Sequence, residues 1–282
     1  MEIRSLLVVG TAHPPPRSDF KKLRRSAVAK IVGLIATGSK TTTWRPLAGL
    51  GDLAGDGWKD FGLRPSLQGN VIWYVVSLLI YPVVAGVVLA IGAVLGLVTA
   101  PNFSFSLLLS VFAGGLVAAF IKNIFEEFAW RGYLAPKVYS LGLNAYVGHA
   151  VVGLIWGCWH IPYLLFLLDP ALIQATTTQS MATFIPLAIV NLIAASIVYG
   201  ELRLLTNSVW PPLLLHTIGN ALVDVLVVQG FVRLAPGTDW LVSPGHQSLL
   251  TMVVFALMGI GLHQFRVRQQ QMNEPSQASS AR

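Results

Sequence analysis

Hydrophobic residues in this chain gather into six long segments, and most of the charged residues lie between or beside them. A helix needs roughly 17–25 apolar residues to span a bilayer, whereas a membrane barrel would show short alternating segments. The pattern therefore predicts an all-α fold, a polytopic transmembrane helical bundle with about six spanning helices. The expected spans cover residues 71–99, 103–138, 146–168, 182–204, 211–228 and 249–265.

The composition agrees with an integral membrane protein. Hydrophobic residues make up 54% of the chain and charged residues 11%, whereas a soluble domain carries about 25% charged residues. The net charge of +7 does not indicate a nucleic-acid partner, because the basic residues cluster beside the predicted spans. The single cysteine, Cys158, excludes an internal disulfide and any multi-cysteine metal site.

The two ends of the chain differ from the apolar middle. Residues 1–68 hold 11 of the 19 lysines and arginines. Within them, the basic and then apolar segment 21–35 is typical of a helix that lies in the membrane interface, or of a cleaved targeting segment. The expected organisation is a basic cytoplasmic or interfacial region (1–68), the helical bundle (69–268) and a Gln- and Ser-rich disordered tail (269–282).

The distribution of basic residues predicts the orientation. Six spans put both termini on one side of the membrane, and short cytoplasmic loops carry an excess of lysine and arginine. Taking the termini as cytoplasmic leaves Arg233 as the one basic residue in the outside loops. We therefore expect a multi-pass protein with both termini in the cytoplasm, in the plasma membrane of a prokaryote. The inside segments then carry Lys59, Arg64, Lys137, Arg203, Arg266 and Arg268.

Three charged residues close the second apolar segment: Glu126, Glu127 and Arg131. A charged side chain at membrane depth costs roughly 2.5–3.5 kcal/mol on insertion scales. Glu127 and Arg131 are four residues apart, so they share a helix face and can pair. Glu126 points elsewhere and follows Lys122 by four residues. An ordinary helix end at the headgroups would also explain these charges.

Three further polar residues lie within spans: His160, His216 and Asn220. His216 and Asn220 are four residues apart and project from one helix face. Glu126 and His160 lie about 15 and 18 residues from the turn that joins their spans, which puts them at similar depth if both segments are helical. We therefore expect them to face each other. A lone histidine or asparagine in a span more often serves as a hydrogen-bond partner between helices.

Other polar and aromatic residues of the spans have simpler interpretations. Glu201 and Arg203 are expected to be solvated charges at the inside boundary. Tryptophans of the spans are expected to serve packing or the membrane interface, and histidines near the span ends are given no role. These residues are Trp130, Trp156 and Trp159, and His149, His246 and His263.

Taken together, the intramembrane carboxylates, histidines and asparagine match the needs of hydrolysis. A carboxylate can deprotonate a water molecule, and a His–Asn pair can donate hydrogen bonds to an oxyanion. Two histidines and a glutamate could equally hold a catalytic zinc ion. The residues alone leave both chemistries open.

The motifs that carry these residues resemble a known family. E-E-x-x-x-R-G-x-L occupies Glu126 to Leu134, an aromatic-x-x-x-His motif ends at His160, and His-x-x-x-Asn begins at His216. This set resembles the CPBP family of intramembrane proteases, which includes the type II CAAX prenyl endopeptidase and the bacterial Abi proteins. The likeness extends over about residues 57–265.

The resemblance implies a role for each matching residue. Glu126 with His160 would activate the attacking water, and His216 with Asn220 would hold the oxyanion of the tetrahedral intermediate. Glu127 and Arg131 would brace the site. The family's usual phenylalanine before the second-motif histidine is Trp156 here, an exchange expected to change the shape of the pocket more than its chemistry.

A metal-free mechanism is preferred, because Asn220 serves better as an oxyanion donor than as a zinc ligand. If zinc is the cofactor, its ligands would be Glu126, His160 and His216.

The expected activity is that of an intramembrane endopeptidase, which cleaves near the cytoplasmic side of the membrane. Its substrate would be a hydrophobic or prenylated peptide, or a membrane-protein segment, that enters from the membrane lipid. One alternative is a non-enzymatic regulator, immunity or scaffold protein that keeps the family fold. A proton-coupled transporter also uses buried glutamate and histidine, but the outer halves of the spans hold few polar residues.

Overall fold

The computed structural model describes residues 60–101 and 103–280 of the chain. Within them, six helices are long and apolar enough to cross a membrane. The predicted all-α bundle with six candidate spans is therefore confirmed. The interfacial or targeting segment expected at 21–35 lies outside the described residues.

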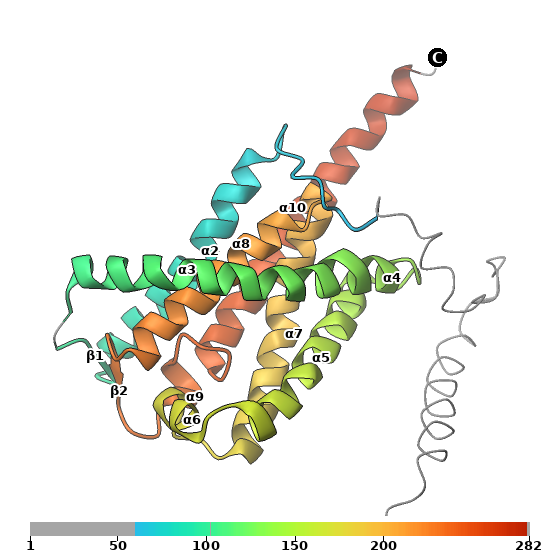
Figure 1. The fold of residues 1–282 in the computed structure, drawn as a ribbon. Helices are drawn as coiled ribbons and strands as arrows, with labels where there is room; N and C mark the ends of the chain where they lie inside the picture. The colour runs from blue at the N-terminus through green and yellow to red at the C-terminus, as the bar shows by residue number, and fades with distance from the viewer. Residues whose placement is uncertain (1–59, 102, 281–282) are drawn as a thin grey trace, which may run out of the picture. The chain divides into compact units, whose positions relative to one another are not determined.

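The candidate spans follow one another along the chain, with short elements between them (Figure 1). The second, third and fifth spans each contain a π-helical segment, labelled η. Short helices α6 (Pro170–Thr176) and α9 (Asp239–Val242) and an antiparallel pair of two-residue strands, β1 (Val98–Thr99) and β2 (Arg233–Leu234), lie between spans. The spans are α2 (Val71–Val94); α3 (Phe105–Glu127) with η2 (Phe128–Leu134) and α4 (Ala135–Tyr139); α5 (Ala145–Pro162) with η3 (Tyr163–Leu167); α7 (Met181–Thr206); α8 (Trp210–Val223) with η4 (Asp224–Val228); and α10 (Leu249–Ser280).

Local sequence signals explain several helix ends. Ser104 and Asn144 cap α3 and α5 by accepting hydrogen bonds from backbone N–H groups of the first turn. The prolines Pro211 and Pro212 open α8, where the missing N–H groups cost nothing. The turn between α4 and α5 uses Gly142 with a φ of +68°, a conformation that favours glycine.

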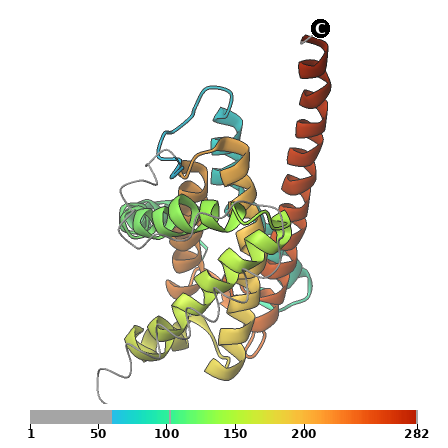
Figure 2. The same ribbon diagram turned by 90° about the vertical axis from the view of Figure 1, so that its right-hand side faces the viewer.

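Helix α7 lies at the centre of the arrangement. It packs against α5 on one side and α10 on another, while α8 packs against both α2 and α3. Helix α3 runs across the bundle, and α10 lies on the opposite side (Figures 1 and 2). The largest core cluster includes Tyr81 of α2, Trp156 of α5, Tyr199 of α7 and Phe255 of α10. This core supports the helices that carry the candidate site.

The expectation that Glu201 and Arg203 are solvated is wrong, because both are buried. Glu201 accepts hydrogen bonds from His149 Nε2 at 2.9 Å, His263 Nδ1 at 2.7 Å and the guanidinium of Arg266. Those donors come from α5 and α10, so neighbouring helices replace the water that the carboxylate loses. A buried charge is tolerated when it is paired and hydrogen-bonded in this way. His149 and His263, given no role above, thus join helices.

Two helix ends differ from the prediction. Helix α2 ends at Val94, where the chain turns at Gly96 (φ +71°) and enters β1. Helix α10 continues past Phe265, where the predicted span ended, to Ser280. Glutamine is a good helix former, and extending an existing helix by a turn costs far less than nucleating one.

Candidate active site

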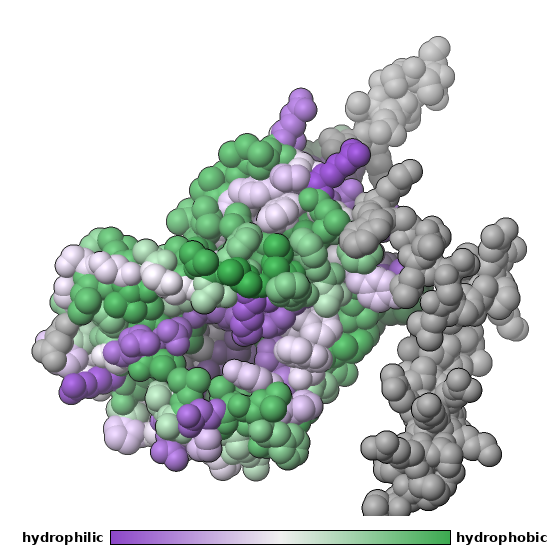
Figure 3. Space-filling view, viewed as in Figure 1, coloured by the Kyte–Doolittle hydropathy of each residue, from purple (hydrophilic) through white to green (hydrophobic). Residues whose placement is uncertain are grey.

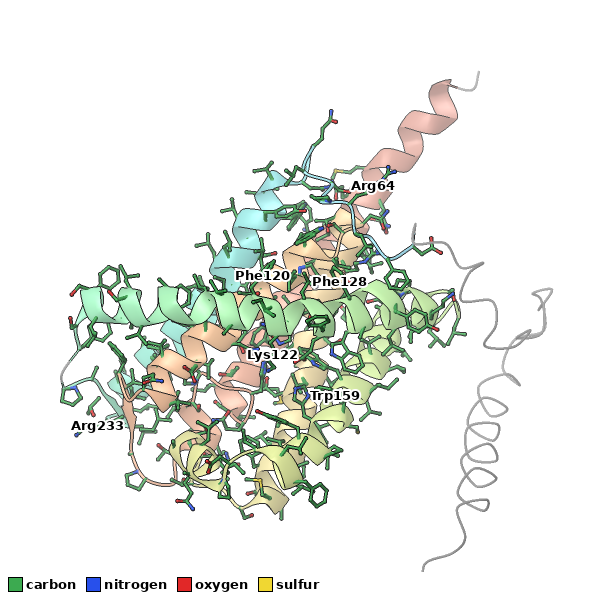
Figure 4. All side chains as sticks on the ribbon, in the orientation of Figure 1. Arg64, Phe120, Lys122, Phe128, Trp159 and Arg233 are labelled. Atoms are coloured by element: carbon green, nitrogen blue, oxygen red, sulfur yellow. The ribbon has the colours of Figure 1, made fainter. Side chains whose placement is uncertain are left out.

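The candidate residues gather around a cavity of about 130 Å³. One of its walls is apolar and comes mainly from α7, while the opposite wall is polar and comes from α3, α5, α8 and the loop before α10. In Figure 3 a hydrophilic hollow opens beneath α3 within largely hydrophobic surface, and Figure 4 shows Lys122 projecting from α3 towards it. The α7 wall consists of Phe184, Ile185, Ala188, Ile189 and Leu192, and the polar wall of Lys122, Trp156, His160, His216, Asn220 and His246.

Helices α3 and α8 are joined by two hydrogen bonds between side chains. His216 Nδ1 lies 2.8 Å from Glu127 Oε1, and Asn220 Nδ2 donates to Asn123 Oδ1 at 2.9 Å. The partners are four residues apart on each helix, so the two bonds lie one turn apart. We call these two hydrogen bonds the α3–α8 rungs. They hold both predicted oxyanion residues, His216 and Asn220, at the polar wall.

Arg131 completes the support of Glu127. Its Nη1 donates to Glu127 Oε1 at 3.0 Å, as the i,i+4 spacing predicted. The guanidinium contacts two neighbouring aromatic rings, with its central carbon 4.1 Å from the Trp156 ring centroid and 4.4 Å from that of Tyr199. A guanidinium stacked on aromatic faces is stabilised by cation–π attraction. Glu127 and Arg131 therefore form a buried ion pair fixed by rings of α5 and α7.

Glu126 lies directly behind the polar wall. The indole N–H of Trp156 donates to Glu126 Oε2 at 3.3 Å, and Lys122 Nζ forms an ion pair with Glu126 Oε1 at 3.5 Å. Both partners line the cavity. Among the described residues, no group donates a hydrogen bond to the buried Oε1 atom. This oxygen is an acceptor available beside the cavity.

The orientation of His160 is set by its own helix. Its Nδ1 lies 2.8 Å from the backbone carbonyl of Trp156. A carbonyl only accepts, so Nδ1 carries the proton, and Nε2 of the neutral ring is an acceptor. Across the α3–α5 hairpin Glu126 contacts Trp156, one turn before His160, and the Trp156 ring centroid lies 6.2 Å from that of His160. Trp156 is thus a neighbour of both residues that were expected to face each other.

Sequence reasoning missed the contacts of Trp156 and the whole role of Asn123. Trp156 was expected to serve packing and to shape the pocket, and it also donates to Glu126 and stacks on Arg131. Its indole N–H is a donor that phenylalanine lacks. The signal available was its position four residues before His160. Asn123 carried no signal, because its partner Asn220 lies on another helix.

His246 was given no role and lines the cavity from the loop before α10. The amide nitrogen of Asn191 donates to the Ser248 carbonyl. The other amide atom, Oδ1, therefore faces His246 Nδ1 at 3.5 Å and acts as the acceptor. His246 Nε2, 2.9 Å from the Tyr81 hydroxyl, is then the acceptor of the neutral ring. Burial lowers the pKa of His246 to about 3, and the neighbouring His216 and His160 act in the same direction. The ring is therefore neutral at physiological pH.

The proposed zinc ligands do not assemble as a metal shell. Among the described residues, no three histidine, cysteine, aspartate or glutamate side chains are arranged to hold a metal ion. Nδ1 of His216 faces Glu127 and Nδ1 of His160 faces a carbonyl. Glu126, His160 and His216 are therefore given no metal-binding role in the proposed mechanism.

The segments that follow Glu127, His160 and Asn220 share an unusual backbone. Each is π-helical: η2 begins directly after Glu127, η3 three residues after His160 and η4 four residues after Asn220. Single π-helical turns inside α-helices occur frequently at functional sites. The site thus combines polar side chains from three helices with a local change of helix winding beside each.

A comparison with protein families agrees with this geometry. Residues 107–222 match the family model described as type II CAAX prenyl endopeptidase Rce1-like. The chain carries an Rce1-like domain. The chain is a multi-pass membrane protein, and the family whose model matches these residues comprises intramembrane proteases. No curated protein and no solved structure matches the chain.

The Rce1-like domain extends from α3 through most of α8. It contains Glu126, His160, His216 and Asn220, so the three motifs identified in the sequence lie inside the matched residues. His246, which also lines the cavity, lies outside them.

Proposed function

We propose that this protein is an intramembrane endopeptidase in which Glu126 and His160 activate a water molecule and His216 and Asn220 stabilise the oxyanion. One observation carries the proposal: acceptors and donors lie on different helices around a single cavity. The acceptors are Glu126 Oε1 behind the wall and His160 Nε2, on α3 and α5. The donors belong to His216 and Asn220 on α8.

Water activation follows from the two acceptors. A water molecule can donate one hydrogen to Glu126 Oε1 and the other to His160 Nε2, which leaves its oxygen lone pair free for attack. The Trp156 N–H holds the second carboxylate oxygen, so Oε1 keeps its direction. General-base catalysis of this kind contributes typically about 10²–10⁴-fold in rate. As the water oxygen bonds to the scissile carbonyl carbon, its proton passes to Glu126.

The oxyanion then forms opposite the acceptors, and Asn220 offers the second hydrogen of its amide nitrogen. His216 donates through Nδ1 to Glu127, so it can donate to the oxyanion through Nε2 only when both ring nitrogens carry protons. Removing one oxyanion donor typically costs about 10²–10³-fold in kcat.

The last step returns the proton. The tetrahedral intermediate collapses as the bond between carbonyl carbon and amide nitrogen breaks, and protonated Glu126 gives its proton to the leaving nitrogen. The products are a new amine and a new carboxylic acid, which gives its remaining proton to the amine or to water, and Glu126 is again ionised. One carboxylate thus acts first as base and then as acid.

The cavity walls support a hydrophobic peptide as substrate, prenylated or not. The α7 wall opposite the polar groups is apolar throughout, and the hollow lies within hydrophobic surface (Figure 3). Such a substrate can enter from the membrane lipid. The distribution of basic residues supports cytoplasmic termini. We place the cleavage site near the cytoplasmic side, and the protein in the plasma membrane of a prokaryote.

The test is cleavage of a panel of prenylated and unmodified hydrophobic peptides by the purified protein in lipid vesicles. Glu126→Gln should abolish cleavage of every peptide that the wild type cuts. Asp169→Asn is the matched control, because it removes an exposed carboxylate and keeps a good N-cap for α6. Wild-type activity in Glu126→Gln, or loss of activity in both variants, would contradict the proposal. If the wild-type protein cleaves no peptide and the Glu126→Gln variant keeps its function in the cell, the protein is a regulator or scaffold.

A further inference from the structure

Asn123 has no part in the three motifs, yet it touches a proposed catalytic group. It lies on α3, fully buried, and its Oδ1 accepts a hydrogen bond from Asn220 Nδ2 at 2.9 Å. Asn220 lines the cavity, and Asn123 lies behind it. The contact joins α3 and α8, the helices that carry the first and third motifs, one helical turn before the two glutamates of α3.

The α3–α8 rungs show what this contact does. Asn123 and Glu127 are four residues apart on α3, as His216 and Asn220 are on α8. The two pairs run in opposite order along their helices, since Asn123 contacts Asn220 and Glu127 contacts His216. Glu127 fixes the ring of His216 through one rung. By the same geometry, Asn123 fixes the amide of Asn220 through the other. Each proposed oxyanion residue therefore has its own holder on α3.

The amide of Asn220 needs such a holder. The terminal torsion of an asparagine side chain is broad and roughly two-fold, so a free amide can present either its nitrogen or its oxygen. Only the nitrogen can donate to an oxyanion, and the carbonyl oxygen would repel it. With Asn123 as acceptor, Nδ2 of Asn220 keeps a fixed position, and its second hydrogen stays available.

Asn123 is also a poor residue for packing alone. Among the described residues, its own Nδ2 has no hydrogen-bond partner although the atom is buried. A leucine of similar size would avoid a buried donor without a partner. The presence of asparagine at this position is explained by the bond to Asn220.

We propose that Asn123 is a positioning residue, which orients the Asn220 amide so that its N–H group faces the oxyanion. The inference rests on the proposed function, because it acts through the oxyanion role of Asn220. It predicts that Asn123 affects the chemical step and leaves peptide binding largely unchanged.

The experiment is a double-mutant cycle on the full-length protein in lipid vesicles, with kcat and KM measured for a peptide that the wild type cleaves. Asn123→Leu should lower kcat roughly 10- to 100-fold, less than the loss of a whole oxyanion donor, with KM changed less than about twofold. In the Asn220→Ala background the same substitution should change kcat by less than about twofold, because the group on which it acts is gone.

Ser77→Ala is the matched control, since Ser77 is equally buried on α2 and, within the described part of the chain, hydrogen-bonds only to the Trp73 carbonyl of its own helix. It should keep wild-type kcat. If Asn123→Leu does not fold, Asn123→Ser serves, because its hydroxyl can bond to a carbonyl of its own helix and is too short to hold Asn220. The same loss of kcat is expected.

The outcomes separate the two proposals. If Asn220→Ala lowers kcat and Asn123→Leu does not, the positioning role is wrong and the oxyanion role stands. Equal fold-losses from Asn123→Leu in both backgrounds would also overturn the positioning role. If Asn220→Ala has wild-type kcat, or the wild type cleaves no peptide, the proposed mechanism fails and the role of Asn123 fails with it.

Discussion

Glu127 Oε1 lies 2.8 Å from His216 Nδ1 and 3.0 Å from Arg131 Nη1. One carboxylate oxygen thus holds a proposed oxyanion residue and a buried guanidinium at the same time. Glu126, the adjacent carboxylate, contacts a different pair of groups, Trp156 and Lys122. We therefore expect the two neighbouring glutamates to have separate tasks, one structural and one chemical, and substitutions should distinguish them.

Glu127→Gln is expected to destabilise the fold, because it leaves the Arg131 charge buried without its partner. Breaking a buried ion pair from one side costs about 3–5 kcal/mol. Glu126→Gln should cost about 1 kcal/mol or less, since Gln keeps an acceptor for Trp156 and Lys122 is largely exposed. The free energy of unfolding in mixed detergent micelles measures both. Equal destabilisation by the two substitutions would contradict this division.

Trp156→Phe should keep the ring on Arg131 and remove the N–H that holds Glu126. A typical hydrogen bond contributes about 0.5–1.5 kcal/mol, so kcat should fall roughly 3- to 10-fold. KM should change little, because the cavity keeps an aromatic wall. Steady-state kinetics on one cleaved peptide checks this. An unchanged kcat would show that the indole N–H does not contribute to catalysis. The family resemblance places phenylalanine, which has no such donor, at this position.

Asp239 gives a pH-dependent contribution to stability outside the spans. Burial alone would raise the pKa of this carboxylate, but hydrogen bonds from Thr177, Thr178 and Gln179 outweigh it and hold the pKa below its usual value. A depressed pKa in the folded state means that the stabilisation is complete above the unfolded-state pKa, about 3.9, and is lost as pH falls through the folded-state value.

Asp239→Asn should therefore destabilise the protein by about 1–3 kcal/mol at pH 7. The difference from wild type should shrink as the pH falls below about 4, where Asp239 of the unfolded wild-type chain begins to take up a proton while the folded carboxylate is still ionised. Thermal unfolding followed from pH 7 to pH 3 tests both points. A difference that stays constant over this range would mean that the charge of Asp239 is not what the three donors stabilise.

Zinc chelation should leave cleavage unchanged, because Glu126, His160 and His216 do not come together as a metal shell. The measurement is kcat before and after dialysis against a strong chelator, with the metal content of the sample determined in parallel. If activity is lost and zinc restores it, these three residues are metal ligands and the water is activated by the ion.

The sequence predicts those parts of the site that depend on one helix. The pairing of Glu127 with Arg131 and the common face of His216 and Asn220 both follow from the i,i+4 geometry of a helix. The six spans follow from the length of the apolar segments. These features are local, so neighbouring residues are enough to predict them.

Contacts between helices could not be predicted in this way. The bond between Asn123 and Asn220 joins residues 97 positions apart, and that between His246 and Tyr81 joins residues 165 apart. Glu201 looked like a boundary charge because its partners lie on α5 and α10. Such contacts depend on how the helices cross, which the hydrophobic pattern of each helix does not specify.

The most direct test of the central claim is a single turnover in water enriched in ¹⁸O, with the protein in excess over a cleavable peptide. If water activated by Glu126 and His160 attacks the peptide directly, the new carboxylate of the first-turnover product carries one ¹⁸O atom. Glu126→Gln should give no product under the same conditions. An unlabelled first-turnover product, with the label in the Glu126 side chain, would show that the carboxylate itself attacks and would contradict the account.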